Sequence, residues 1–319
     1  MKIAVIFSFL ISGILSLSAQ VRLESRLNMF RAGDEIVKQQ VQYKDPGRAG
    51  ENVLWDFSKL NIVNNEYVLM YDTIGGFITG KEHNTWYYYS ISGDSLLCHG
   101  YENSTTMVKN ECPELLLRFP VNYGDSTFSY YSGNGRYCDR LKISAMGTIS
   151  SKVDACGTMI LPDGDTLKNV LRVHTVKKIS ENLESVFLYR EKTPEAFIST
   201  DSVNYRLATD TLLLELDTYR WYMAGYRYPV FETVKSISNN YGRARDFFST
   251  AFFYPIKDHS YLDNDPENRD LLRSDTENDN QQNPDPWSGL SYNCYPNPAS
   301  NDLNIEAFMP KSGRENATD

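Results

Sequence analysis

The stretch Trp86-Tyr87-Tyr88-Tyr89-Ser90-Ile91 leads through Gly93-Asp94 into Leu96-Leu97-Cys98-His99-Gly100-Tyr101. Both runs are rich in aromatic and other β-favouring residues. The Gly-Asp pair between them supplies positive φ and a side chain that can bond its own backbone, as a tight turn requires. The two runs therefore predict strands joined by a turn.

The same pattern recurs through most of the chain, and no long stretch shows a clean 3.6-residue period. Turn residues separate the runs at the spacing of a β-sandwich or barrel. We therefore predict a mostly β fold, with an antiparallel β-sandwich or barrel-like body. The other predicted strands span residues 37–43, 67–71, 115–119, 127–131, 141–149, 170–179, 186–189, 212–216, 219–223 and 230–234.

Composition divides the chain into four parts. Residues 1–19 have a lysine, an apolar run and small residues at the end, which predict a signal peptide. Residues 20–257 form the β-rich body, as one domain or two subdomains. Residues 258–290 are rich in Asp, Asn, Glu, Gln and Pro and poor in apolar residues, so we expect a disordered acidic linker. Residues 291–319 are expected to form a short C-terminal β tag.

The tag begins with Tyr295-Pro296-Asn297-Pro298, and Leu303 and Ile305 then alternate with Asn304 as on a one-sided strand. This stretch resembles the opening of the type A C-terminal sorting domain of the type IX secretion system, found in exported proteins of Bacteroidetes. The resemblance implies the type IX secretion machinery as a partner. It covers residues 295 to about 306 and the chain stops at Asp319, so we expect a partial sorting domain.

Two body segments, Trp55-Asp56-Phe57-Ser58 and Val170-Leu171-Arg172-Val173, also resemble segments of such exported proteins. We therefore expect a secreted or cell-surface location, or a periplasmic one if the partial tag is inactive. No segment after the signal peptide is apolar enough to span a membrane.

Charge argues against nucleic acid as a partner. The chain has a net charge of −9, and residues 258–285 carry nine acidic residues against two basic ones. The body is left nearly neutral, and a neutral body has no field that attracts phosphates.

Six Asp-Ser or Asp-Thr pairs precede an apolar residue or a threonine, more than composition predicts. They resemble the O-glycosylation acceptor pattern of Bacteroidetes exported proteins, which implies a glycoprotein. The alternative is that Asp-Thr simply suits turns before a strand. The hydroxyl residues concerned are Thr73, Ser95, Ser126, Thr166, Ser202 and Thr211.

An exported chain can hold disulfides. The simplest pairing joins Cys98 to Cys112 and Cys138 to Cys156, and the alternative is four buried free thiols.

Aromatic clusters suggest a surface that stacks on sugar rings, because a flat aromatic face can replace water over the C–H face of a sugar. The candidates are Trp86, Tyr88, Trp221 and Tyr226. Cross-strand core packing is the alternative.

The sequence gives little support for catalysis, because the four histidines lack metal-ligand spacing and no nucleophile motif occurs. We name no catalytic residue, metal or cofactor. The leading hypothesis is an exported, non-catalytic cell-surface or secreted protein with a binding or presentation role, for which glycans are one candidate ligand. The alternatives are a secreted glycan hydrolase, whose two carboxylates the sequence cannot rank, and a structural part of an envelope assembly.

Overall fold

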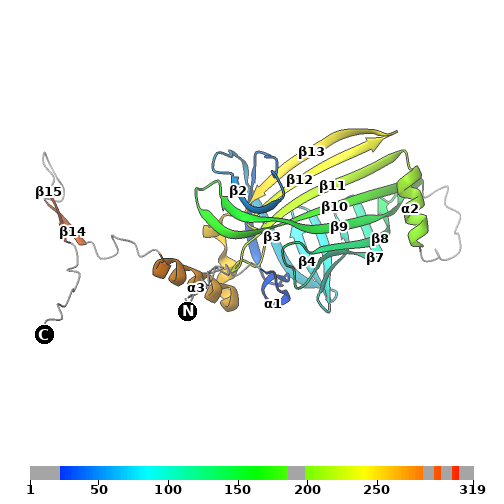
Figure 1. Ribbon diagram of the computed structural model, residues 1–319. Helices are drawn as coiled ribbons and strands as arrows, with labels where there is room; N and C mark the ends of the chain where they lie inside the picture. The colour runs from blue at the N-terminus through cyan, green and yellow to red at the C-terminus, as the bar shows by residue number, and fades with distance from the viewer. Residues whose placement is uncertain (1–21, 186–197, 283–290, 296–303, 309–319) are drawn as a thin grey trace, which may run out of the picture. The chain divides into compact units, whose positions relative to one another are not determined.

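A computed structural model describes residues 22–185, 198–282, 291–295 and 304–308 (Figure 1). Its elements are α1 (Ser25–Asn28), β1 (Glu35–Val41), β2 (Gly50–Asp56), β3 (Ile62–Ile74), β4 (Phe77–Glu82), β5 (Thr85–Ser92), β6 (Ser95–Glu102), β7 (Thr106–Arg118), β8 (Ser126–Tyr137), β9 (Leu141–Ile160), β10 (Thr166–Ser185), α2 (Thr200–Thr209), β11 (Leu212–Tyr222), β12 (Phe231–Asn240), β13 (Arg243–Phe253), η2 (Ile256–Asp258), η3 (Ser260–Asn264), α3 (Pro266–Gln282), β14 (Ser291–Tyr295) and β15 (Asn304–Phe308).

Twelve antiparallel strands close into a barrel, which confirms the prediction of a mostly β, barrel-like body. Sequence neighbours pair from β3 to β13, and β13 returns to pair with β1, which pairs with β3. β2 stands outside this order, because it pairs in parallel with the part of β9 that β8 leaves free. The predicted strand at 186–189 lies outside the described residues.

One end of the barrel is filled by apolar and aromatic side chains. Tyr89 of β5 and Tyr222 of β11, from opposite walls, meet the same buried cluster together with Met29 of the N-terminal segment. Beside them, Tyr228 stacks on Tyr71, and Tyr261 lies against Tyr228. We call this end the closed end.

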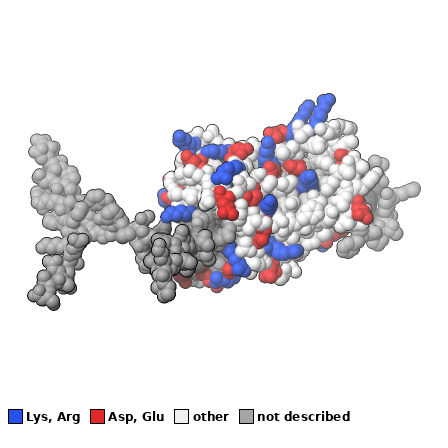
Figure 2. Space-filling view, viewed as in Figure 1, with Lys and Arg blue, Asp and Glu red and all other residues white. Residues whose placement is uncertain are grey.

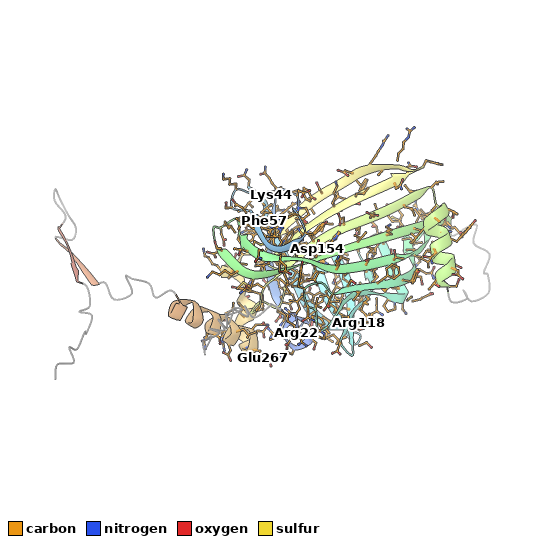
Figure 3. All side chains as sticks on the ribbon, viewed as in Figure 1. Arg22, Lys44, Phe57, Arg118, Asp154 and Glu267 are labelled. Atoms are coloured by element: carbon orange, nitrogen blue, oxygen red, sulfur yellow. The ribbon has the colours of Figure 1, made fainter. Side chains whose placement is uncertain are left out.

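A second apolar layer covers the outside of the barrel. Trp55 and Phe57, from β2 and the residue after it, pack edge-on against Trp221 of β11. Beneath them Arg172 is buried against Asp154, with 2.8 Å between Nε and Oδ1. Figure 3 shows Phe57 and Asp154 where this segment crosses β9.

Three glycines between β6 and β10 allow neighbouring strands to approach one another closely. A Cβ added to Gly100, Gly135 or Gly147 would lie within about 2 Å of a backbone oxygen on the neighbouring strand. Only a residue without a side chain permits so close an approach.

The prediction of a disordered acidic linker is wrong for the first part of that segment. Residues 256–282 are helical, and Tyr261, Asp265 and Asn268 are buried. Asp265 binds the buried Arg227, with 2.7 Å between Oδ2 and Nε, and the Asn268 amide donates to the Leu27 carbonyl. The compact unit therefore extends to Asn268, eleven residues beyond the predicted boundary at Lys257.

The remaining residues form a separate unit from Arg269 onward. In it β14 pairs with β15 in an antiparallel two-stranded sheet, and Tyr295 lies opposite Asn304. This agrees with the predicted C-terminal β tag. The predicted signal peptide lies outside the described residues.

Candidate functional site

The barrel interior carries paired charges next to the closed end. Lys38 of β1 contacts Glu82 of β4, with 2.7 Å between Nζ and Oε1, and Arg220 of β11 binds Glu232 of β12. Arg220 lies on the same face of β11 as the core residue Tyr222, yet 38% of its side chain is accessible to water. An inward-facing side chain reaches water only through space inside the barrel.

The two pairs are electrostatically linked. Burial alone would raise the pKa of Glu232, but Arg220 and Lys38 outweigh it and hold that pKa below its usual value. Burial would likewise lower the pKa of Arg220, but Glu232 raises it overall. The Arg220–Glu232 pair therefore stays ionised. We call the two charged pairs the polar floor.

Tyrosines surround this floor. Burial raises the pKa of Tyr71, Tyr89 and Tyr254 well above the usual value, and it raises that of Tyr87 to about 12. These phenols therefore remain protonated and act as hydrogen-bond donors at neutral pH.

Further along the barrel Lys177 of β10 binds Glu114 of β7, with 2.7 Å between Nζ and Oε1. The ammonium also lies 4.7 Å from the centre of the Tyr131 ring, and the Asn110 amide donates to Glu114. Glu181 lies on the same face of β10, and partial desolvation raises the pKa of its carboxyl although the side chain is still accessible to water.

The other end of the barrel has apolar inward-facing residues that are not covered. Leu214 and Leu216 share a face of β11 with Thr218 and Arg220, and both are only half-buried. Leu212, on the same face, is 60% exposed, and Phe248, opposite the inward Ser236, is 45% exposed. Apolar side chains inside a filled barrel would be covered, so the described residues leave this end open to water. We call it the open end.

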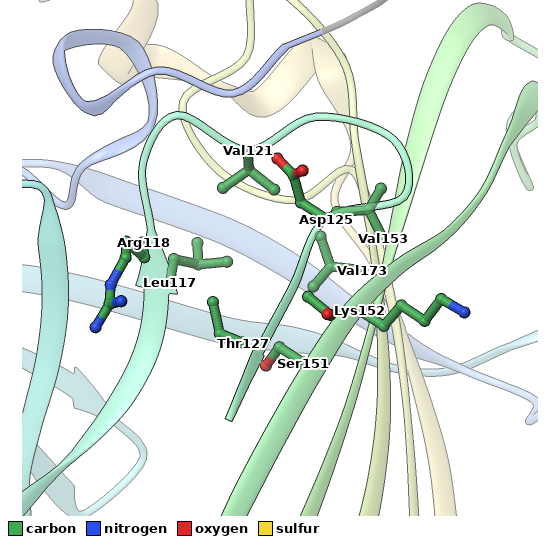
Figure 4. A pocket seen from close by; sticks show the side chains of 10 residues that line it. Leu117, Arg118, Val121, Asp125, Thr127, Ser151, Lys152, Val153 and Val173 are labelled. Carbon is green, nitrogen blue, oxygen red and sulfur yellow. The ribbon is translucent and has the colours of Figure 1, made fainter. Parts of the chain in front are cut away.

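A small cavity also occurs at the closed end (Figure 4). Its volume is about 20 Å³, and its walls include Leu117, Val121, Val153 and Val173. This is room for about one water molecule, so a ligand does not fit there.

The predicted stacking residues do not form one platform. Trp221 is fully buried under β2 and Tyr226 is 6% exposed against His259, so neither can stack on a ligand. Trp86 and Tyr88 do share the outer face of β5 and are half-buried. Lys81 lies over the Trp86 ring at 5.3 Å, and the Tyr88 hydroxyl donates to Glu102.

The predicted disulfides are absent, because Cys98, Cys112, Cys138 and Cys156 are free thiols. Cys98 faces the interior, and burial raises the pKa of its thiol to about 12. Cys138 is exposed in the β8–β9 turn. These four residues are free thiols, but only Cys98 is buried as the alternative expected; Cys112 and Cys156 are half-buried and Cys138 is exposed.

The predicted glycosylation residues are accessible except for Ser95, which is half-buried. Ser202 lies in α2 rather than in a turn, whereas Thr73, Ser126 and Thr166 lie near strand ends. Glycosylation itself stays a prediction. Of the sorting motif, Tyr295 ends β14 and Ile305 lies in β15, while Pro296, Asn297, Pro298 and Leu303 lie outside the described residues.

No family model, curated protein or solved structure matches this chain. Across residues 22–185 and 198–282 and the two short C-terminal strands, no three His, Cys, Asp or Glu side chains group closely enough to hold a metal ion. Within the same parts of the chain, no helix has the length and apolar character to span a membrane.

The accessible interior of the barrel and its charged pairs were not predicted from the sequence. Successive residues of β11 point to opposite faces as in any strand, but nothing local shows that its inward face surrounds accessible space. The one available signal was the placement of Lys38, Glu82, Glu114 and Arg220 within runs that otherwise alternate as strands.

Proposed function

We propose that the chain is an exported binding protein that holds a small amphipathic molecule inside its barrel. The observation that carries this proposal is the exposure of inward-facing apolar residues at the open end, with Leu212 at 60% and Phe248 at 45%. Ligand sites combine such apolar walls with a few placed polar groups. Here the polar groups are the charged pairs and phenols of the floor.

The proposed ligand is amphipathic because the inner wall of the barrel changes from apolar at the open end to polar at depth. Leu212, Leu214 and Leu216 offer an apolar wall near the open end, and Arg220 offers donors at depth. A ligand with a polar group and an apolar portion matches both regions, because each buried polar group then finds a partner.

The test uses two neighbouring leucines of one strand. Leu214→Trp adds bulk to the interior, whereas Leu213→Trp adds the same bulk to the outer face. Titration with a fluorescent amphiphile should show saturable binding that weakens at least about tenfold in Leu214→Trp and is unchanged in Leu213→Trp. Native mass spectrometry of the purified chain would identify a bound molecule. Equal weakening in both variants, or no saturable binding, would reject the interior site.

Glycan recognition on the outer face is a second candidate, supported by Trp86 and Tyr88, which share the outer face of β5 and are only half-buried. Here the ligand would be an oligosaccharide stacked on these rings. Binding of soluble oligosaccharides that disappears in Trp86→Ala but persists in Leu214→Trp would favour this candidate. The reverse result would assign the sugar to the interior.

Export is proposed on the predicted signal peptide and on the resemblance of residues 295–306 to a sorting domain. Fractionation of the native host, with detection of the cleaved chain outside the cytoplasm, tests this part separately.

A further inference from the structure

The hairpin of β12 and β13 has large exposed side chains at the rim of the open end. Tyr241 is 78% exposed and Phe247 is 73% exposed. Two cations, Arg243 and Arg245, are exposed on the same strand. Basic side chains stand out from this end of the barrel in Figure 2.

The two arginines act together. They are two residues apart on β13 and lie opposite Asn240 and Ser238, which in turn lie opposite the inward-facing Leu212 and Leu214. Both arginines therefore project from the inner face of the hairpin, at the rim of the open end. With Asn240, Ser238 and Tyr241, they line an open hollow of about 560 Å³.

Few acidic groups neutralise the positive charge of the two arginines in this hollow. The acidic residue that lines it is Asp246, which binds Lys235 at 3.0 Å. Among the described residues neither Arg243 nor Arg245 has an ion-pair partner. The hairpin therefore presents two available guanidinium groups beside exposed aromatic rings.

We propose that the β12–β13 turn docks on an anionic lipid surface. Arginine donors match lipid phosphates in geometry and charge. Tyrosine and phenylalanine rings at the same site can enter the boundary between headgroups and acyl chains. A free inorganic anion would leave Phe247 and Tyr241 without a role, so charge and apolar exposure together favour the lipid surface.

The experiment measures co-sedimentation of the full chain with vesicles of phosphatidylcholine, with and without phosphatidylglycerol. Each basic residue near an anionic surface contributes about fivefold in partitioning, so Arg243→Gln with Arg245→Gln should weaken binding about 30-fold. Phe247→Ser should also weaken it. The matched control is Arg118→Gln with Lys152→Gln, which removes two exposed charges outside the hairpin and should lose far less.

Circular dichroism and thermal unfolding of each variant show whether it is folded. Equal binding to both vesicle types, or equal losses in the arginine pair and the control pair, would overturn the proposal. So would tight binding of inorganic phosphate without vesicle binding, which would make the hollow a site for a free anion. A dimer that Phe247→Ser dissociates would instead assign the turn to contact between two copies.

Discussion

At the scale of single residues, His259 links the folded state to pH. Its side chain is buried against Tyr226 and Tyr261, and burial lowers its pKa from 6.5 to about 4. The unfolded chain therefore takes up a proton before the folded chain does as the pH falls. The contribution of neutral His259 to the free energy of unfolding is therefore complete above pH 6.5 and is lost as the pH falls from 6.5 to about 4.

We predict that the free energy of unfolding falls by about 3 kcal/mol across this window and that His259→Gln removes most of the fall. Asp265 does not interfere, because Arg227 outweighs burial and holds its pKa below 3.8. Urea unfolding at pH 7, 5 and 4 measures the effect. His83→Asn, at an exposed position, is the control and should keep the full slope. An unchanged slope in His259→Gln would show that another group is responsible.

The sequence predicted which residues share a face of a strand, but it did not predict which outer faces are covered by other segments. Trp86 and Tyr88 share a face of β5, as their spacing indicates. Trp221 could not be placed from the sequence, because the outer face that bears it is covered by Trp55 and Phe57. That cover arises from the parallel pairing of β2 with β9, about a hundred residues away, and no local pattern encodes it.

At the scale of elements, the close pairing of the long strands β9 and β10 depends on a glycine. A Cβ at Gly147 would lie 1.8 Å from the Lys178 carbonyl oxygen, so even alanine would force the two strands apart. Gly164 offers a comparison, because its surroundings are open and only its positive φ of 93° disfavours a side chain.

We predict that Gly147→Ala costs several times more stability than Gly164→Ala, which should lose only about 1 to 2 kcal/mol. Thermal and urea unfolding of both variants test the difference. Similar losses would mean that β9 and β10 can move apart at little cost and that their pairing does not depend on Gly147.

Most strands and turns were predictable from sequence, because each depends on alternation and turn chemistry within a few residues, but β4 and β13 were missed. The segment 258–268 was not predictable, because its acidic composition resembles a solvated linker. Its order depends on one buried arginine, Arg227, that lies 38 residues from Asp265. A composition average cannot show that one carboxylate has a specific partner.

At the scale of the whole molecule, the domain boundary follows from this contact. A chain that ends at Lys257, where composition places the linker, would leave Arg227 buried without Asp265 and would uncover the surface that Tyr261 fills. A chain that ends at Gln282 keeps the complete first unit and the whole of α3.

We predict that the chain ending at Gln282 melts within a few degrees of the full chain, since each unit is held by its own contacts. The chain ending at Lys257 should lose about 3 to 5 kcal/mol from the broken buried pair, which lowers the melting temperature by roughly 10 °C. Differential scanning calorimetry of the three chains measures both shifts. Asp265→Asn in the full chain isolates the ion pair and should give part of the larger shift. If the chain ending at Lys257 melted with the full chain, residues 258–268 would contribute nothing to the fold, and the boundary predicted from composition would be restored.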